Sequence, residues 1–361
     1  MFGDVYKNKK VVVFGHSGFK GSWLSVWLKK LGAEVYGFSL LPEDPFSGFY
    51  VMGVHKDTIS VFDDIRDLDS VKKFIDDIRP DFVFHLAAQA LVGRSYADPI
   101  STWNTNLIGT INILETLRGL DHECVAVIIT SDKVYKNKEW VWGYRENDEL
   151  GGSDPYSASK SAAEIAVASY LKSFLADLPN LRLATTRAGN VIGGADWSDG
   201  RVVPDCMQAW FKNEEVVLRQ PYSTRPWQHV LEPLSGYLTL GQMLFHNSNF
   251  DGNSFNFGPR DTFDVTVADL VGLMEHEWLQ AKWSVSKHAS FAEAGLLKLN
   301  CDKAASLLNW RSTLEIRQTV QFTVNWYKCF LENQETIEEF SKKQIDDFTL
   351  IAKENGSQWV I

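Results

Sequence analysis

The first half of the chain alternates short, continuously apolar segments with longer amphipathic ones, and this alternation restricts the possible folds more than any other feature. The apolar segments are rich in β-branched residues, as expected of parallel strands that are covered on both faces. We predict strands at residues 9–15, 33–39, 58–62, 81–88, 125–130 and 181–187, and helices at residues 21–32, 67–80, 101–120 and 156–178. This order predicts an α/β fold with a doubly wound parallel sheet of the Rossmann type.

After about residue 190 the sequence becomes irregular and carries many glycines, prolines and tryptophans. Such loop-rich sequence fits a smaller α/β domain that supplies a substrate pocket. We therefore predict a Rossmann domain at residues 1–189 and a C-terminal substrate-binding domain at residues 190–361, with some of the chain crossing back to the first domain.

The composition excludes several classes of protein. A net charge of −10 argues against a nucleic-acid partner, because such proteins normally carry a basic face. No apolar run approaches membrane-spanning length, and the N-terminus has no apolar secretory segment. The cysteines are scattered, without a CxxC pair or a histidine at metal-ligand spacing. We expect a soluble cytoplasmic protein with reduced thiols, no metal and no membrane partner.

Three glycines lie between the first predicted strand and the first predicted helix. Gly15, Gly18 and Gly21 form the spacing GxxGxxG in "FGHSGFKGSWL". The first glycine permits a tight turn, the second lets a pyrophosphate approach the backbone, and the third lets the helix pack closely on the sheet. The motif predicts a bound dinucleotide, so residues 1–189 form the cofactor-binding domain.

The end of the second predicted strand distinguishes NAD from NADP. Enzymes that bind NAD usually carry Asp or Glu there to hold the ribose hydroxyls. Ser39 occupies the position in this chain, and no arginine stands beside it to pair with a 2′-phosphate. Because nothing basic is present, we predict NAD. Asp64, after the third strand, can accept a hydrogen bond from the adenine amino group, with a helix cap as the alternative.

Two groups of reactive side chains follow. Tyr156 and Lys160 stand four residues apart at the start of a predicted helix, so both point to one side. A phenol beside an ammonium can ionise near neutrality and take the proton of a sugar hydroxyl while hydride leaves for nicotinamide. The stretch "TSDKVY" places Ser131, Asp132 and Lys133 where another strand ends. The alternative for this stretch is a solvated turn with an Asp–Lys pair.

The order of these motifs, with "HLAA" and Asn106 between them, resembles the extended short-chain dehydrogenase/reductase family over nearly the whole chain. Within that family, a hydroxyl–Asp–Glu run after the fifth strand is typical of nucleotide-sugar 4,6-dehydratases. Lys133 replaces the glutamate here, and together with "TRPWQHVLEPL" it resembles the members that act on CDP-glucose. The resemblance implies an NAD-dependent lyase of deoxysugar biosynthesis for lipopolysaccharide O-antigen, without net redox change.

The resemblance also implies residue roles. Tyr156 would deprotonate the C4 hydroxyl, Asp132 would protonate the departing C6 oxygen, and Lys133 would remove the C5 proton. The cofactor-binding set is Gly15, Gly18, Phe19, Gly21, Ser39, Asp64, Ile65, Ala87, Ala88, Asn106, Tyr156 and Lys160. The substrate-binding set is Arg94, Asn190, Arg201, Arg225 and His229, for which a structural hydrogen bond or a surface charge is the alternative.

The implied partners are a small-molecule nucleotide sugar and a second copy of the chain. The family forms homodimers through a four-helix interface, which corresponds here to residues 101–120 and 161–175, with a tetramer as the alternative. Two rival functions stay open. A C4 epimerase needs Tyr156 and Lys160 but has no use for Asp132 with Lys133, and a non-catalytic nucleotide-sensing protein commonly lacks the tyrosine or the lysine. The choice of CDP over dTDP rests on the resemblance alone.

Overall fold

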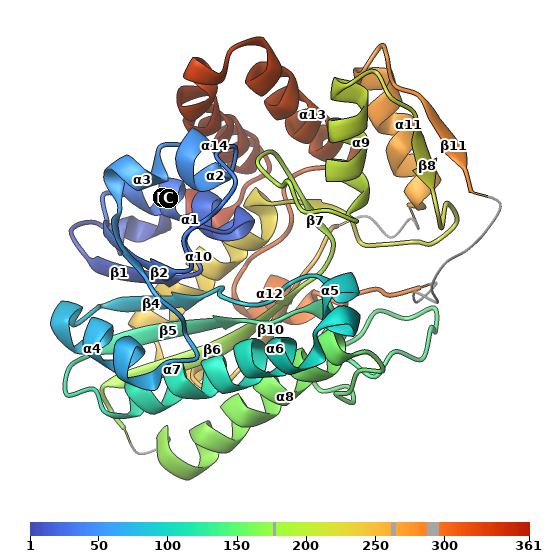
Figure 1. The fold of residues 1–361 in the computed structure, drawn as a ribbon. Helices are drawn as coiled ribbons and strands as arrows, with labels where there is room; N and C mark the ends of the chain where they lie inside the picture. Colours follow the sequence, from blue (N-terminus) through green and yellow to red (C-terminus); the bar gives the residue numbers. More distant parts are fainter. Residues whose placement is uncertain (176–177, 261–264, 287–295) are drawn as a thin grey trace.

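A computed structural model describes residues 1–175, 178–260, 265–286 and 296–361. Seven parallel strands form one sheet in the order β10-β6-β5-β4-β1-β2-β3 (Figure 1). These strands are β1 (Lys10–Phe14), β2 (Glu34–Ser39), β3 (Ile59–Phe62), β4 (Phe82–His85), β5 (Cys124–Ile129), β6 (Leu181–Ala188) and β10 (Ser254–Phe257). The order reverses between β1 and β4, which confirms the predicted doubly wound α/β fold. In such sheets ligands bind beyond the carboxyl ends of the strands at this reversal.

Helices cover both faces of the sheet (Figure 1). They are α1 (Phe19–Lys30), α2 (Gly48–Val51), α3 (Val54–Asp57), α4 (Leu68–Ile78), α5 (Val92–Ala97), α6 (Pro99–Trp103), α7 (Gly109–Arg118), α8 (Pro155–Tyr170), α9 (Val202–Phe211), α10 (Leu231–His246), α11 (Val267–Glu277), α12 (Asp302–Leu307), α13 (Ile316–Glu332) and α14 (Ile337–Glu354). Side chains of strand β1 belong to two hydrophobic cores, one on each face of the sheet, because successive side chains point to opposite faces. Val12 and Phe14 pack with α4, α7 and α8, whereas Val11 and Val13 pack with α1 and α10.

Sequence signals for the helix ends agree with the structure. The carboxylate of Asp67 accepts hydrogen bonds from the N–H groups of Asp69 and Ser70 at 3.0 and 3.2 Å, so Asp67 is the N-cap of α4. Gly32 follows α1 with a φ of +81°, the left-handed conformation that terminates helices.

Two predicted helices are interrupted. The helix predicted at residues 101–120 contains a π-helical turn at Asn104–Ile108 between α6 and α7. The helix predicted at residues 156–178 passes into a second π-helical turn at Leu171–Leu175, and residues 176–177 lie outside the described residues. Apolar periodicity does not distinguish these turns from regular helix, although π-turns often mark functional positions.

The second half of the chain does not fold separately from the first. Strand β10 pairs with β6, and α10 packs on the sheet, so part of this half completes the Rossmann core. Two small parallel sheets lie outside it, β7 (Val191–Ile192) with β9 (Gln228–His229) and β8 (Val216–Leu218) with β11 (Trp283–Val285). The domain boundary at residue 190 stays a prediction.

The chain ends lie side by side (Figure 1). The Gly3 N–H donates to the Ile361 carbonyl at 3.0 Å, and Trp359 stacks on Phe2 with ring centroids 5.1 Å apart. Within the described ranges, no helix has both the length and the apolar character needed to cross a bilayer.

Candidate active site

The glycine turn connects β1 to α1. Gly15 has a φ of +84°, and a Cβ there would lie 2.7 Å from the backbone nitrogen of Ala87. A Cβ on Gly21 would lie 2.0 Å from the carbonyl oxygen of Gly15, so both positions exclude side chains. Gly18 is the N-cap and Phe19 the first residue of α1. The amino end of this helix therefore faces the predicted pyrophosphate position, where the helix dipole favours an anion.

The end of β2 holds a polar cluster that the sequence predicted only in part. The buried Ser39 Oγ lies 3.0 Å from His16 Nδ1 and 2.7 Å from Ser17 Oγ. Burial lowers the pKa of His16 to about 4, so its ring is neutral near neutral pH. His16 and Ser17 were not predicted as site residues, although a histidine inside a glycine turn is a usable signal. The position that normally carries an acidic residue is thus occupied by neutral hydroxyls and a neutral imidazole.

Asp64 and Ile65 follow β3. Both carboxylate oxygens of Asp64 accept hydrogen bonds from Arg66, including one from Nε at 2.9 Å, and this pairing lowers the pKa of Asp64. The helix-cap alternative does not apply to Asp64, because Asp67 is the N-cap of α4. Ile65 is buried, and its carbonyl accepts a hydrogen bond from Asn112 Nδ2 at 3.0 Å. The contact of Asp64 with adenine stays a prediction. Its carboxylate already accepts hydrogen bonds from the guanidinium of Arg66.

The half-buried Ala87 and Ala88 lie in the segment after β4, where the predicted strand ends earlier than expected. Asn106, in the first π-helical turn, binds this segment. Its Oδ1 accepts from the Gln89 N–H at 2.8 Å, and its Nδ2 donates to the Ser159 Oγ at 2.9 Å. The buried Asn106 side chain thus connects the segment to α8 rather than lying open to a ligand.

The predicted catalytic residues come together at the carboxyl edge of β5. Tyr156 and Lys160 are buried in the first half of α8, and Lys160 Nζ donates to the Ile129 carbonyl at 3.3 Å. Ser131 and Asp132 are also buried, and the Ser131 hydroxyl donates to Asp132 Oδ1 at 3.0 Å. Lys133 is half-buried, and its ammonium makes no hydrogen bond within the part of the chain that the structure describes. The solvated-turn alternative does not fit the burial of Asp132.

Asp132 has the properties of a general acid. Burial raises the pKa of its carboxyl, with Lys133 opposing the shift. Its Oδ2 is buried without a hydrogen-bond partner among the described residues, and a Cβ on Gly189 would lie 2.0 Å from it. A protonated carboxyl in this position keeps one O–H available for a ligand.

One expectation about Tyr156 is corrected. The sequence predicts that the ammonium of Lys160 helps the phenol to ionise near neutrality. In the structure burial raises the pKa of Tyr156, and hydrogen bonding with Ser131 and the charge of Arg201 oppose this shift without reversing it. Burial also lowers the pKa of Lys160 to about 8.

Lys20, in the first turn of α1, was missed by the sequence analysis. Burial, together with the charges of Arg201 and Lys160, lowers its pKa to about 8, and Asp132 and Asp196 oppose the shift. These mutual effects place Lys20 near the catalytic residues, although it pairs with none of the described residues. The sequence signal for this residue was a lysine within the glycine turn, in "GFKG".

The predicted substrate residues divide into two groups. Arg201 lies in the site, where its Nη1 pairs with Asp196 Oδ2 at 3.0 Å and its charge acts on Tyr156. The charge of Arg225 reaches Asp132, and a cavity of about 430 Å³ opens beside Arg225. Asn190 follows β6 with a φ of +32°, and its carbonyl accepts from the Gln228 N–H at 3.3 Å.

Arg94 and His229 are not brought to this cluster by the described contacts. Arg94 is exposed on α5. His229 is fully buried, with its ring edge-to-face against Trp23 and Phe322 at centroid distances of 6.1 and 5.5 Å. Burial lowers its pKa to about 3. His229 therefore lies in the core, with its Nε2 unpartnered among the described residues, and its role as a substrate contact stays a prediction.

A doubly wound sheet, a glycine turn after its first strand and a buried Ser–Tyr–Lys group define the extended short-chain dehydrogenase/reductase class. A profile of the family described as GDP-mannose 4,6 dehydratase matches residues 12–323, and the chain belongs to this family. The chain is 42% identical over 350 residues to CDP-glucose 4,6-dehydratase of Salmonella typhimurium, which covers 96% of this chain and 97% of the relative.

Solved structures show the same fold at lower identity. The dTDP-glucose 4,6-dehydratase of Bacillus anthracis, in complex with NAD, has a TM-score of 0.74 and 20% identity over 89% of this chain and 96% of its own. The UDP-glucose 4-epimerase of Thermotoga maritima has a TM-score of 0.76 and 21% identity over 89% of this chain and 99% of its own. Dehydratases and epimerases share this fold, so the fold alone does not choose between the two reactions.

Proposed function

We propose that this protein is a lyase that converts CDP-glucose to CDP-4-dehydro-6-deoxyglucose and water. The observation that carries the proposal is the buried Asp132, whose Oδ2 has no partner among the described residues and whose pKa burial raises. Together with Lys133 it adds an acid and an amine to a dehydrogenase site. An epimerase has no use for this pair. The 42% identity to a CDP-glucose 4,6-dehydratase supports the same choice and the CDP-linked substrate.

The proposed cofactor is NAD. The glycine turn leaves room for a pyrophosphate, and the cluster around Ser39 offers hydroxyls to a ribose but no cation to a 2′-phosphate. The neutral ring of His16 adds no charge there. A bound NAD would supply the acceptor for hydride from C4 of the sugar and the donor of hydride to C6.

The side chains of this chain supply the proton transfers. Tyr156 takes the proton of the C4 hydroxyl, and Lys160 beside it supplies positive charge. The C4 ketone then acidifies the C5 proton, which Lys133 removes. Asp132 donates its proton to the C6 oxygen, which departs as water. Lys133 returns its proton to C5 when hydride is added at C6. Arg201 and Arg225 hold the substrate diphosphate, because guanidinium groups bind such anions through paired hydrogen bonds.

Purified protein is expected to turn over many equivalents of CDP-glucose with catalytic NAD and no net reduction of the cofactor. The reason is that one site holds the groups for oxidation, elimination and reduction. The measurement is cofactor absorbance together with the alkali-dependent chromophore of the 4-keto-6-deoxy product. Stoichiometric reduced cofactor would indicate a simple dehydrogenase, and a product without the chromophore would indicate an epimerase. Parallel assays with dTDP-, GDP- and UDP-glucose test the nucleotide preference.

Lys133→Met is expected to permit C4 oxidation but to stop exchange of the C5 proton with deuterated solvent. Methionine keeps the length of the side chain and removes only the amine. Lys136→Met is the control, because Lys136 lies on the same segment and pairs with Glu149 at the surface. If C5 exchange in the 4-keto intermediate continues at the wild-type rate, Lys133 is not the base.

We further propose a homodimer through the helices α6, α7 and α8. Four large apolar side chains on α6, α8 and the two π-helical turns are 42–69% exposed: Ile100, Ile108, Ile165 and Phe174. A second copy would cover these side chains. A cytoplasmic location fits the cysteines, each of which is a free thiol. A role in deoxysugar synthesis for O-antigen stays a proposal.

A further inference from the structure

A buried ion pair outside the predicted site joins α8 to β6. The side chains of Glu164 and Arg187 are each 3% exposed. Arg187 donates from Nε to Glu164 Oε1 at 2.9 Å and from Nη2 to Glu164 Oε2 at 3.0 Å, a two-point contact. Glu164 follows Lys160 by one helical turn and Tyr156 by two, so the three side chains share one side of α8.

This pair holds both ends of the segment that carries the elimination residues. At one end, the Thr130 hydroxyl donates to Glu164 Oε1 at 2.6 Å. At the other end, Arg187 Nη1 donates to the Tyr135 hydroxyl oxygen at 2.8 Å, and the guanidinium lies 4.9 Å from the centre of the Tyr135 ring. Asp132 lies between these two attachment points.

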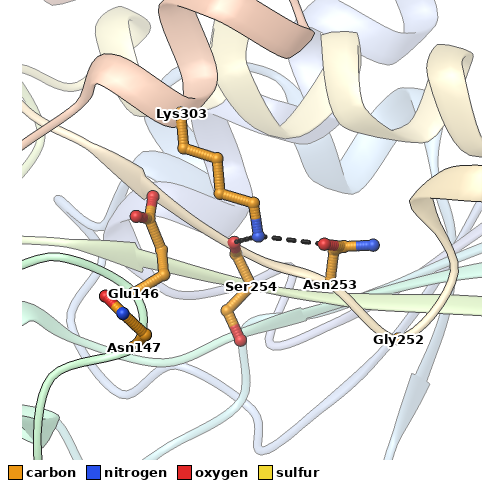
Figure 2. A pocket seen from close by; sticks show the side chains of 6 residues that line it. All are labelled: Glu146, Asn147, Gly252, Asn253, Ser254 and Lys303. Atoms are coloured by element: carbon orange, nitrogen blue, oxygen red, sulfur yellow. Dashed lines mark hydrogen bonds between the residues drawn. The ribbon is translucent and has the colours of Figure 1, made fainter.

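The network continues to the edge of the sheet. The Tyr135 hydroxyl donates to Asn256 Oδ1 on β10 at 2.6 Å. Arg187 also donates to the Glu146 carbonyl at 2.9 Å and to the Ser254 Oγ at 3.3 Å. Glu146 and Ser254 line a cavity of about 360 Å³ that shares no residue with the predicted site (Figure 2). Each N–H group of the Arg187 guanidinium therefore donates a hydrogen bond to a neighbouring segment.

We propose that Glu164 and Arg187 are positioning residues, which fix the segment from Thr130 to Tyr135 so that Asp132 and Lys133 reach C5 and C6 of the substrate. The inference rests on the proposed dehydratase function. The Tyr135 end of the segment should affect elimination more than C4 oxidation, because Asp132 and Lys133 lie on the segment itself, whereas Tyr156 and Lys160 lie on α8. A displacement of about 1 Å in such a group costs on the order of 10² in rate.

The test compares Tyr135→Phe with Tyr144→Phe. The two rings stack at a centroid distance of 5.0 Å, and both hydroxyls are buried, but the Tyr144 hydroxyl contacts Asn137 and Lys138 rather than Arg187. In a single turnover, Tyr135→Phe should oxidise C4 at close to the wild-type rate. It should then eliminate water about 10- to 100-fold more slowly, with reduced cofactor accumulating. Tyr144→Phe should match the wild type in both steps.

Arg187→Lys gives an independent measurement, because lysine keeps the charge toward Glu164 but lacks the planar fork that also reaches Tyr135. It should show the same selective slowing, and the double variant with Tyr135→Phe should be no slower than Arg187→Lys alone. Equal slowing of both steps, or identical behaviour of the two tyrosine variants, would overturn the positioning role. Absence of dehydration in the wild type would instead reject the proposed function.

Discussion

Tyr156→Phe should lower the rate of C4 oxidation by about 10² to 10⁴, the usual loss when a positioned general base is removed. The variant loses one oxygen from a buried ring, so its fold and cofactor binding should survive. The measurement is the rate at which bound cofactor is reduced after mixing with CDP-glucose.

Tyr170→Phe is the matched control for this variant. Tyr170 lies on the same helix, and its hydroxyl donates to Glu115 at 3.2 Å, away from the catalytic cluster. It should reduce cofactor at the wild-type rate. If Tyr156→Phe did so as well, the assignment of Tyr156 as the base would be wrong, whatever its effect on complete turnover.

Asp132→Asn should separate oxidation from elimination. The amide keeps the shape of the carboxyl but cannot donate an acidic proton to the departing C6 oxygen. Reduced cofactor should form in the first turnover and then persist, because C6 accepts hydride only after water has left. We expect elimination to slow by at least about 10². Rapid reoxidation of the cofactor with normal product would reject Asp132 as the acid.

The control is Asp251→Asn. Burial also raises the pKa of Asp251, and its carboxylate accepts from the Leu183 N–H at 2.6 Å, outside the site. An amide oxygen can accept the same hydrogen bond, so the variant should eliminate water at the wild-type rate. This comparison separates a catalytic carboxyl from a buried structural one.

The raised pKa of Asp132 gives the pH dependence of the elimination step a definite sign. The step needs the protonated carboxyl, and burial keeps the proton bound to a higher pH than in a free aspartate. The contribution of Asp132 to elimination should therefore be lost as the pH rises through its folded-state pKa. Asp132→Asn should remove this alkaline loss. The same profile in the variant and the wild type would assign the titration to another group.

Local sequence determined much of the fold and the identity of the main reactive groups. The alternation of apolar strands and amphipathic helices predicted the parallel sheet, because burial on both faces demands continuous apolar strands. The glycine spacing predicted the turn after β1, since the positive φ of Gly15 and the contact of Gly21 with Gly15 are local, whereas the close approach of Ala87 to Gly15 comes from a distant segment. Tyr156 and Lys160 could be predicted because helical spacing alone places them on one side of α8.

Only the tertiary structure decided which polar side chains are buried and which charges meet. Asp132 and His229 both look reactive in the sequence, but Asp132 lies with Ser131 and Tyr156 at the carboxyl edge of β5, whereas His229 lies between aromatic rings in the core. The return of β10 to the sheet brings Asn256 to Tyr135, 121 residues earlier in the chain. A pKa depends on the atoms that surround a group in space, and for these residues the surroundings come from distant segments that no local pattern brings together.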